Sequence, residues 1–179
     1  METLDIGLSS WIIQDGNYED FEVDREYRFA LKFDAIRFDP AHDQRRYLKP
    51  LQAAEYRFCG EIIMGEAGLT VLDVGVLCYE ERRTPQSERF AAGELFLGID
   101  PFFWTENHCK RSGVPNLFYN SRIREIRLET TPRVEAAKNT FKRRPGVRTF
   151  SPLTRTNAWD DDNCYAEYVL TCELLGPSL

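Results

Sequence analysis

The chain has 179 residues, of which 42% are hydrophobic and 29% charged, so a wholly disordered chain is excluded. No run of about 18 apolar residues is present, which excludes a conventional transmembrane helix. The formal net charge of −6 argues against non-specific binding of nucleic acid. This length suits one domain with its own core, and we expect a single globular β-rich domain over residues 1–179.

Alternating apolar residues dominate the first part of the chain. Residues 4–8 alternate, and residues 27–33 do so again, with the period of two that a strand requires. The apolar positions then move from odd to even numbers before Ile36 and Phe38. One extra residue in a strand has this effect, so we predict a β-bulge near residues 34–35.

The middle of the chain has the pattern of an antiparallel meander. Residues 39–52 contain two prolines and several basic residues and predict a loop. Two alternating runs separated by Gly65–Gly68 predict a hairpin. Its strands are expected at 55–64 and 70–81, a loop at 82–89, and further strands at 94–100, 122–130 and 164–175.

One segment, TTPRVEAAKNTFKRRPG, predicts a helix near residues 131–145. Thr131 can cap its start, and a first-turn proline follows. Val134, Ala137 and Phe141 then form an apolar stripe at helical spacing. Pro145 and Gly146 end the pattern.

These elements together predict a mostly β protein with one helix. The meander spacing, the glycines inside strands and the phase change favour an antiparallel barrel or a strongly curled sheet over a flat sandwich. An oligonucleotide-binding-type barrel is one candidate. That is a statement about architecture and implies no activity.

The stretch GELFLGIDPFFWTENHC, residues 93–109, predicts a strand followed by a short aromatic lid. We expect Asp100 to cap a helical turn and Phe102 or Phe103 to fill the core. Three adjacent aromatic residues cannot all be buried by one regular face. We therefore expect Trp104 to be partly exposed and available to a partner.

Other side chains invite chemical interpretations that the spacing does not favour. His108 and Cys109 could form a nucleophile and base, but sequence neighbours rarely point at each other. A zinc site from these two with His42 and Cys164 has no recognisable ligand spacing. Residues 160–162, three aspartates, could hold a divalent cation, but a solvated turn explains them better. We expect no metal and no cofactor.

Charge is distributed unevenly, and the acidic stretch 15–26 suggests a function. Residues 1–132 carry a net −7, whereas residues 133–155 carry +6. We predict a non-catalytic module that binds a protein partner, plausibly a basic one, in the manner of an acidic inhibitor or immunity-type protein. The predicted contact residues are Asp15, Glu19, Asp20, Glu22, Asp24 and Trp104.

A single-stranded nucleic-acid binder is the alternative. The run KNTFKRRPGVRTF interleaves bases with aromatic residues, as phosphate contacts and base stacking require. Against it, Phe141 belongs to the predicted helix stripe and the remainder of the chain is acidic. The residues of this alternative site are Lys138, Lys142, Arg143, Arg144 and Arg148. An enzyme with a dispersed site is a third possibility. The absence of a phosphate loop, a nucleophile elbow and an HExxH motif counts against it, but a barrel enzyme can assemble its site from scattered residues.

Five cysteines, an odd number with no CxxC spacing, indicate thiols rather than disulfides. The acidic amino terminus lacks the features of an export signal. We therefore expect a cytoplasmic protein that has no association with membranes and whose five cysteines are all unpaired.

Overall fold

The computed structural model describes residues 3–42, 44–66, 68–81, 88–111, 113–138 and 140–177. The fold is mostly β, with 59% strand and two short helices, as predicted. The strands are β1 (Thr3–Ser9), β2 (Glu26–Pro40), β3 (Tyr47–Gln52), β4 (Glu55–Glu66), β5 (Leu69–Asp73), β6 (Leu77–Glu80), β7 (Phe90–Ile99), β8 (Phe118–Glu129), β9 (Arg133–Ala137), β10 (Thr140–Arg143), β11 (Phe150–Leu153) and β12 (Glu167–Pro177). The helical segments are α1 (Ser10–Gln14), α2 (Phe102–Cys109) and the 3₁₀ turn η1 (Asp161–Cys164). No helix in the described ranges is both long and apolar enough to cross a membrane.

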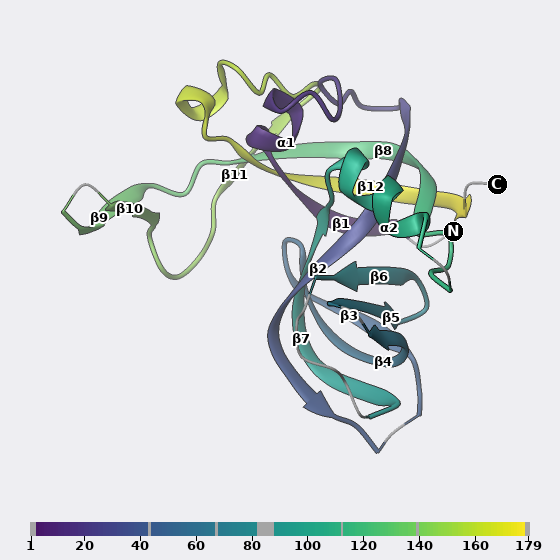
Figure 1. The fold of residues 1–179 in the computed structure, drawn as a ribbon. Coiled ribbons are helices and arrows are strands. Elements are labelled where there is room, and N and C mark those ends of the chain that lie inside the picture. The colour runs from purple at the N-terminus through teal and green to yellow at the C-terminus, as the bar shows by residue number, and fades with distance from the viewer. Residues whose placement is uncertain are drawn as a thin grey trace.

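Ten strands form one strongly curled sheet that turns back on itself twice. Its order is β11-β8-β12-β1-β7-β2-β6-β5-β4-β3, with further pairings β8–β2 and β7–β4. These extra pairings close two rings of five strands, β8-β12-β1-β7-β2 and β2-β6-β5-β4-β7, which share the β2–β7 pair. In Figure 1 the first ring makes the upper part of the body and the second ring the lower part. The prediction of a strongly curled sheet is confirmed.

The predicted bulge in β2 is present. The antiparallel register of β2 with β7 shifts between Ala35 and Arg37, so Ile36 has no partner residue on β7. Opposite the bulge, Gly93 has a φ of +155°, and a Cβ atom there would lie 2.0 Å from the backbone oxygen of Arg37. The extra residue bends β2, and a glycine allows the two backbones to approach at the bend.

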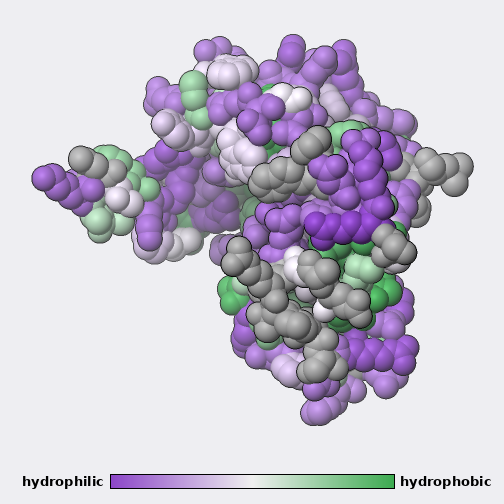
Figure 2. Space-filling model, in the orientation of Figure 1, coloured by the Kyte–Doolittle hydropathy of each residue, from purple (hydrophilic) through white to green (hydrophobic). Residues whose placement is uncertain are grey.

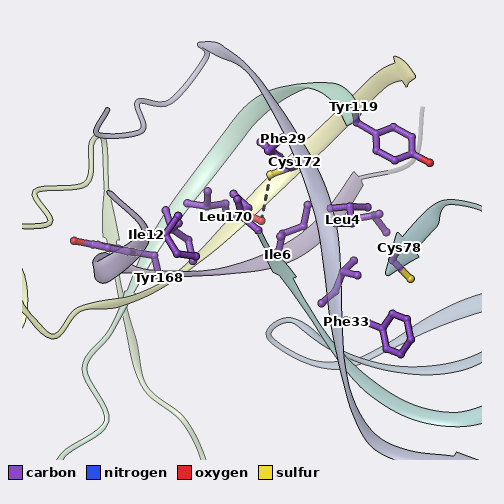
Figure 3. Packing of buried hydrophobic residues seen from close by; sticks show 14 of the residues in the cluster. Leu4, Ile6, Ile12, Phe29, Phe33, Cys78, Tyr119, Tyr168, Leu170 and Cys172 are labelled. Carbon is purple, nitrogen blue, oxygen red and sulfur yellow. Dashed lines mark hydrogen bonds between the residues drawn. The ribbon is translucent and has the colours of Figure 1, made fainter. Parts of the chain in front are cut away.

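The core lies inside the two rings and is drawn in Figure 3. It holds side chains from the predicted strand faces, including Ile6, Phe33, Tyr168 and Leu170, each at most 1% exposed. The thiol of Cys172 is also buried and donates a weak hydrogen bond to the carbonyl oxygen of Leu170, 3.6 Å away. None of the five cysteines forms a disulfide, which confirms that prediction.

The predicted helix at 131–145 is wrong, because these residues form the antiparallel hairpin β9–β10. Just before the hairpin, the backbone N–H of Thr130 donates to the carbonyl oxygen of Thr149 at 2.8 Å. A helix over 131–145 would extend about 21 Å. The few residues up to Thr149 could return only about 14 Å. Pairing of β8 with β11 therefore requires the chain to go out and come back as a hairpin.

Two smaller expectations are also wrong. The segment 39–52 is not wholly a loop, because β2 continues to Pro40 and β3 begins at Tyr47. The expected strand 70–81 is two strands joined by a tight turn, β5 and β6. At this turn Gly75 has a φ of +102°, and its N–H donates to the carboxylate of Asp73 at 2.9 Å. This local hydrogen bond forms a turn that ends β5, although the strand-like pattern of apolar residues in the sequence continues beyond it.

We predict that Gly93→Ala destabilises the protein by about 2 kcal/mol or more, because the new methyl group meets backbone atoms that cannot move aside. Gly98→Ala on the same strand is the control, since its Cβ atom would meet its nearest neighbour at 3.4 Å, an ordinary contact. Urea unfolding of the two variants measures the difference. Equal stability of both would contradict this account of the bulge.

Candidate functional site

The β9–β10 hairpin projects from the body as a two-stranded arm, residues 133–148 (Figure 1). It forms a separate two-stranded sheet outside the ten-stranded one. The arm contains six basic residues and one acidic residue, a formal charge of +5, which leaves −11 for the rest of the chain. The projecting arm thus carries a net positive charge on a chain whose remainder is net negative.

The base of the arm is held by a buried ion pair. The Glu129 side chain is 3% exposed and accepts two hydrogen bonds from Arg148, from Nη2 at 2.5 Å and from Nε at 3.1 Å. Burial raises the pKa of Glu129, but Arg148, with help from Thr131 and Arg143, lowers it by more, so this pKa lies below its usual range. The hydroxyl of Thr131 also accepts the N–H of Thr149 at 2.9 Å. Arg148, which was predicted to bind nucleic acid, therefore holds the base of the arm through its pair with Glu129.

A second ionic contact joins the arm to the turn η1. Arg133 and Arg143 face each other across the hairpin. Both donate from Nη2 to the same oxygen of Asp162, at 2.8 Å and 2.6 Å. Arg143 donates in addition to the carbonyl oxygen of Thr131 at 2.8 Å. Of the three aspartates at 160–162, this one therefore anchors the arm.

The outer part of the arm carries exposed basic and apolar side chains. Lys138, Lys142 and Arg144 are exposed, and their side chains have no ionic partner among the described residues. Phe141 is 61% exposed and Val147 90% exposed. Figure 2 shows hydrophilic and hydrophobic residues next to each other on this arm. The expectation that Phe141 packs into the body is wrong, because it followed from the helix that the structure replaces.

Two further exposed aromatic residues flank the turn η1, whose Asp162 binds the arm. Trp159 is 61% and Tyr165 67% exposed, and the guanidinium of Arg133 lies 5.6 Å from the centre of the Tyr165 ring. Sequence reasoning missed both residues. The available signal was two large aromatic side chains within the polar stretch NAWDDDNCY. The other two aspartates are bonded elsewhere: Asp160 accepts from the side-chain amide of Asn157 and Asp161 from the Tyr168 hydroxyl on β12, each at 2.8 Å.

The acidic segment 15–26 is partly neutralised by contacts within the protein. Asp20 accepts from the hydroxyl of Thr156 at 2.8 Å and from the N–H of Ala158 at 3.1 Å. Glu22 lies 2.9 Å from Arg25 and 3.5 Å from Arg155, and Asp24 lies 3.2 Å from Arg124. Asp15 and Glu19 are exposed. The predicted contact residues therefore do not form one uniformly free anionic surface.

Asp100 is buried and does not cap a helix, so that prediction is wrong. Its carboxylate accepts hydrogen bonds from the hydroxyls of Tyr79 and Thr105, and Lys32 lies 3.9 Å away. Helix α2 starts after Pro101 without a side-chain cap. Burial raises the pKa of Asp100 above its usual range, against the hydrogen bond from Tyr79. The carboxylate of Asp100 therefore points into the protein, where it accepts from the buried hydroxyl of Tyr79.

The aromatic part of this segment is only partly described. Phe102 packs against Phe118, with ring centres 5.1 Å apart, which agrees with a role as a lid over the core. The side chains of Phe103 and Trp104 lie outside the described part of the structure. The contact role of Trp104 therefore stays a prediction.

The predicted alternatives at His108 and Cys109 have no support in the geometry. His108 is buried, with Nε2 2.6 Å from a carboxylate oxygen of Glu81. The Cys109 thiol contacts the carbonyl oxygen of Pro115 at 3.9 Å. Within the described ranges, no three His, Cys, Asp or Glu side chains are grouped as metal ligands. These two neighbours thus have separate structural partners.

Comparison with known proteins gives no relative: no family model, no curated protein and no solved structure matches this chain.

We predict that the base of the arm loosens in acid. Because the folded pKa of Glu129 lies below its ordinary value of 4.5, its ion pair contributes stability above that pH and loses it as pH falls through the folded pKa. Arg148→Gln should cost about 1–3 kcal/mol at neutral pH by leaving the carboxylate without its charged donor. It should also flatten the pH dependence of stability below pH 4.5. Thermal melts across pH measure both effects, and Lys138→Gln, on the free part of the arm, should change neither.

Proposed function

We propose that this protein is a non-catalytic binding module that engages single-stranded nucleic acid through its β9–β10 arm. The observation that carries the proposal is the presence, on one projecting element, of an exposed Phe141 and three cations that have no ionic partner among the described residues. Cations contact phosphates, and an aromatic face stacks on bases without sequence preference. We further propose a cytoplasmic location, because five cysteines outside any disulfide suit a reducing compartment.

The acidity of the body does not prevent an anion from approaching the arm. A strand of five residues such as β9 extends about 16 Å. Charges in physiological salt are screened over about 8 Å. The outer cations of the arm therefore act on a ligand largely independently of the body's negative charge.

The aromatic residues give a reason to favour nucleic acid. Phe141 lies on the same face of the hairpin as Arg143, two residues along the strand. Beyond Arg143, that face leads to Arg133 and the exposed ring of Tyr165. Alternating aromatic and cationic groups are the arrangement by which sequence-tolerant single-strand binders hold bases and phosphates.

A protein partner is the second candidate, and the strand edges favour it. Both edge strands of the ten-stranded sheet, β3 and β11, contain a proline, Pro50 and Pro152, which hinders pairing with another strand. The paired strands of the arm contain no proline. The arm can therefore add to a strand of another protein, and its charge suits an acidic partner. This candidate retains the prediction of a protein partner but moves the contact from residues 15–26 to the arm.

We predict that the intact protein binds a fluorescent oligodeoxythymidine of 20 nucleotides and that the triple variant Lys138→Gln, Lys142→Gln, Arg144→Gln binds at least tenfold more weakly. If each cation contacts one phosphate, the slope of log affinity against log salt should decrease by about 2 in magnitude. Phe141→Ser should weaken binding about tenfold, which corresponds to one lost stacking contact. Fluorescence anisotropy at several salt concentrations measures all three effects.

The matched control is a second triple variant that loses the same charge elsewhere, Arg25→Gln, Arg37→Gln, Arg57→Gln, at sites 56–63% exposed. It should bind like the wild-type protein apart from a small general charge effect. An equal loss in both triple variants would contradict a site on the arm. If no oligonucleotide binds, but a protein captured from nuclease-treated lysate is lost on Phe141→Lys, the protein-partner candidate takes precedence.

A further inference from the structure

A cavity of about 360 Å³ lies where the arm meets the body. It is lined by both legs of the arm, by Thr131 and Pro132, and by Asp162 of η1. Two of its lining side chains are the arginines that face each other across the hairpin, Arg133 and Arg143. Two carboxylates, Glu129 and Asp162, also line it, so the arginines give the cavity its cationic character on the arm side only. The exposed ring of Tyr165 lies 5.6 Å from the guanidinium of Arg133.

Asp162 does not accept hydrogen bonds from all the donors of the arginine pair. A single oxygen of Asp162 accepts from both guanidinium groups. The Nε–H of Arg143 is buried and has no hydrogen-bond partner among the described residues. A buried, charged donor without an acceptor is unfavourable, and a further oxygen at this position would satisfy it. Asp162 therefore leaves one donor of the arginine pair unbonded.

We propose that the Arg133–Arg143 pair is a phosphate-binding site, and that a phosphate of bound nucleic acid replaces Asp162 there. This inference depends on the proposed function for the identity of the ligand. A phosphate presents several oxygens in a tetrahedral arrangement. It can accept from Nε and Nη2 of Arg143 and from Nη2 of Arg133 together, as Arg–phosphate pairs commonly do. A carboxylate offers only two coplanar oxygens, and Asp162 uses one.

The segment that holds Asp162 is suited to being displaced. Asp162, Asn163 and Cys164 follow one another in the left-handed region, with φ of 48°, 55° and 71°. Three consecutive non-glycine residues in this region are strained. No residue of η1 is buried, so Asp162 can turn away from the arm while Asp161 and Cys164 keep their hydrogen bonds to Tyr168 and Ser10. Release of Asp162 would relieve the strain and free both arginines for the ligand.

The test begins with inorganic phosphate, titrated into the intact protein by calorimetry in a chloride buffer. Asp162→Asn removes the competing charge and should bind phosphate at least tenfold more tightly than the wild-type protein. Adding Arg143→Gln to Asp162→Asn should abolish that gain. The inference is overturned if Asp162→Asn binds phosphate no more tightly, or if the double variant binds as well as the single one. Asp162→Gly, which also removes the charge and accepts a positive φ, must reproduce the gain, and a thermal melt confirms that each variant is folded.

The same variants with the 20-nucleotide oligomer separate this inference from the proposed function. We expect Asp162→Asn to bind the oligomer more tightly too, with a steeper dependence on salt because one more phosphate contact forms. Tighter phosphate binding without any oligomer binding would keep the phosphate site and reject the nucleic-acid function. Oligomer binding that depends on Lys142 but is unchanged by Asp162→Asn would keep the function and reject this site.

Discussion

The antiparallel pairing of β2 with β7 is the constraint on which the rest of the structure depends. It runs from Leu31 opposite Ile99 to Pro40 opposite Ala91. The outer edge of β2 pairs with β8 near one end and meets β6 further along. The outer edge of β7 pairs with β4 and meets β1. Each ring thus uses one part of the same strand pair, and neither could close if that pair were lost.

Closure of the two rings also limits which strand edges remain available to pair with another chain. Eight of the strands in the curled sheet have neighbours on both sides, and the two at its ends are edge strands with a proline each. These edges resist addition of a further strand. The pairing of β8 with β11 is extended outward by the hydrogen bond between Thr130 and Thr149, and the arm begins directly beyond it. The arm consequently forms a two-stranded sheet of its own that projects from the body.

The basic residues of the arm differ in role according to their distance from its base. Arg148 is paired with the buried Glu129, and Arg133 and Arg143 share Asp162. Lys138 and Lys142 lie further out, are exposed, and have no ionic partner among the described residues. Ionic contacts near the body hold the arm in place, and this anchoring allows the outer cations to remain exposed.

The sequence by itself determined the long strands of the two rings, such as β2, β4 and β12, because a period of two is a local property that burial on one side of a sheet preserves. It also determined the bulge in β2, from the change of phase before Ile36. The apolar spacing of Val134, Ala137 and Phe141 satisfied a helix equally well, and only the hydrogen bond between Thr130 and Thr149 decided for a hairpin. The anchoring of the arm was likewise decided by tertiary structure. Such contacts join residues far apart in the chain, and their free energy outweighs weak local preferences that the sequence alone displays.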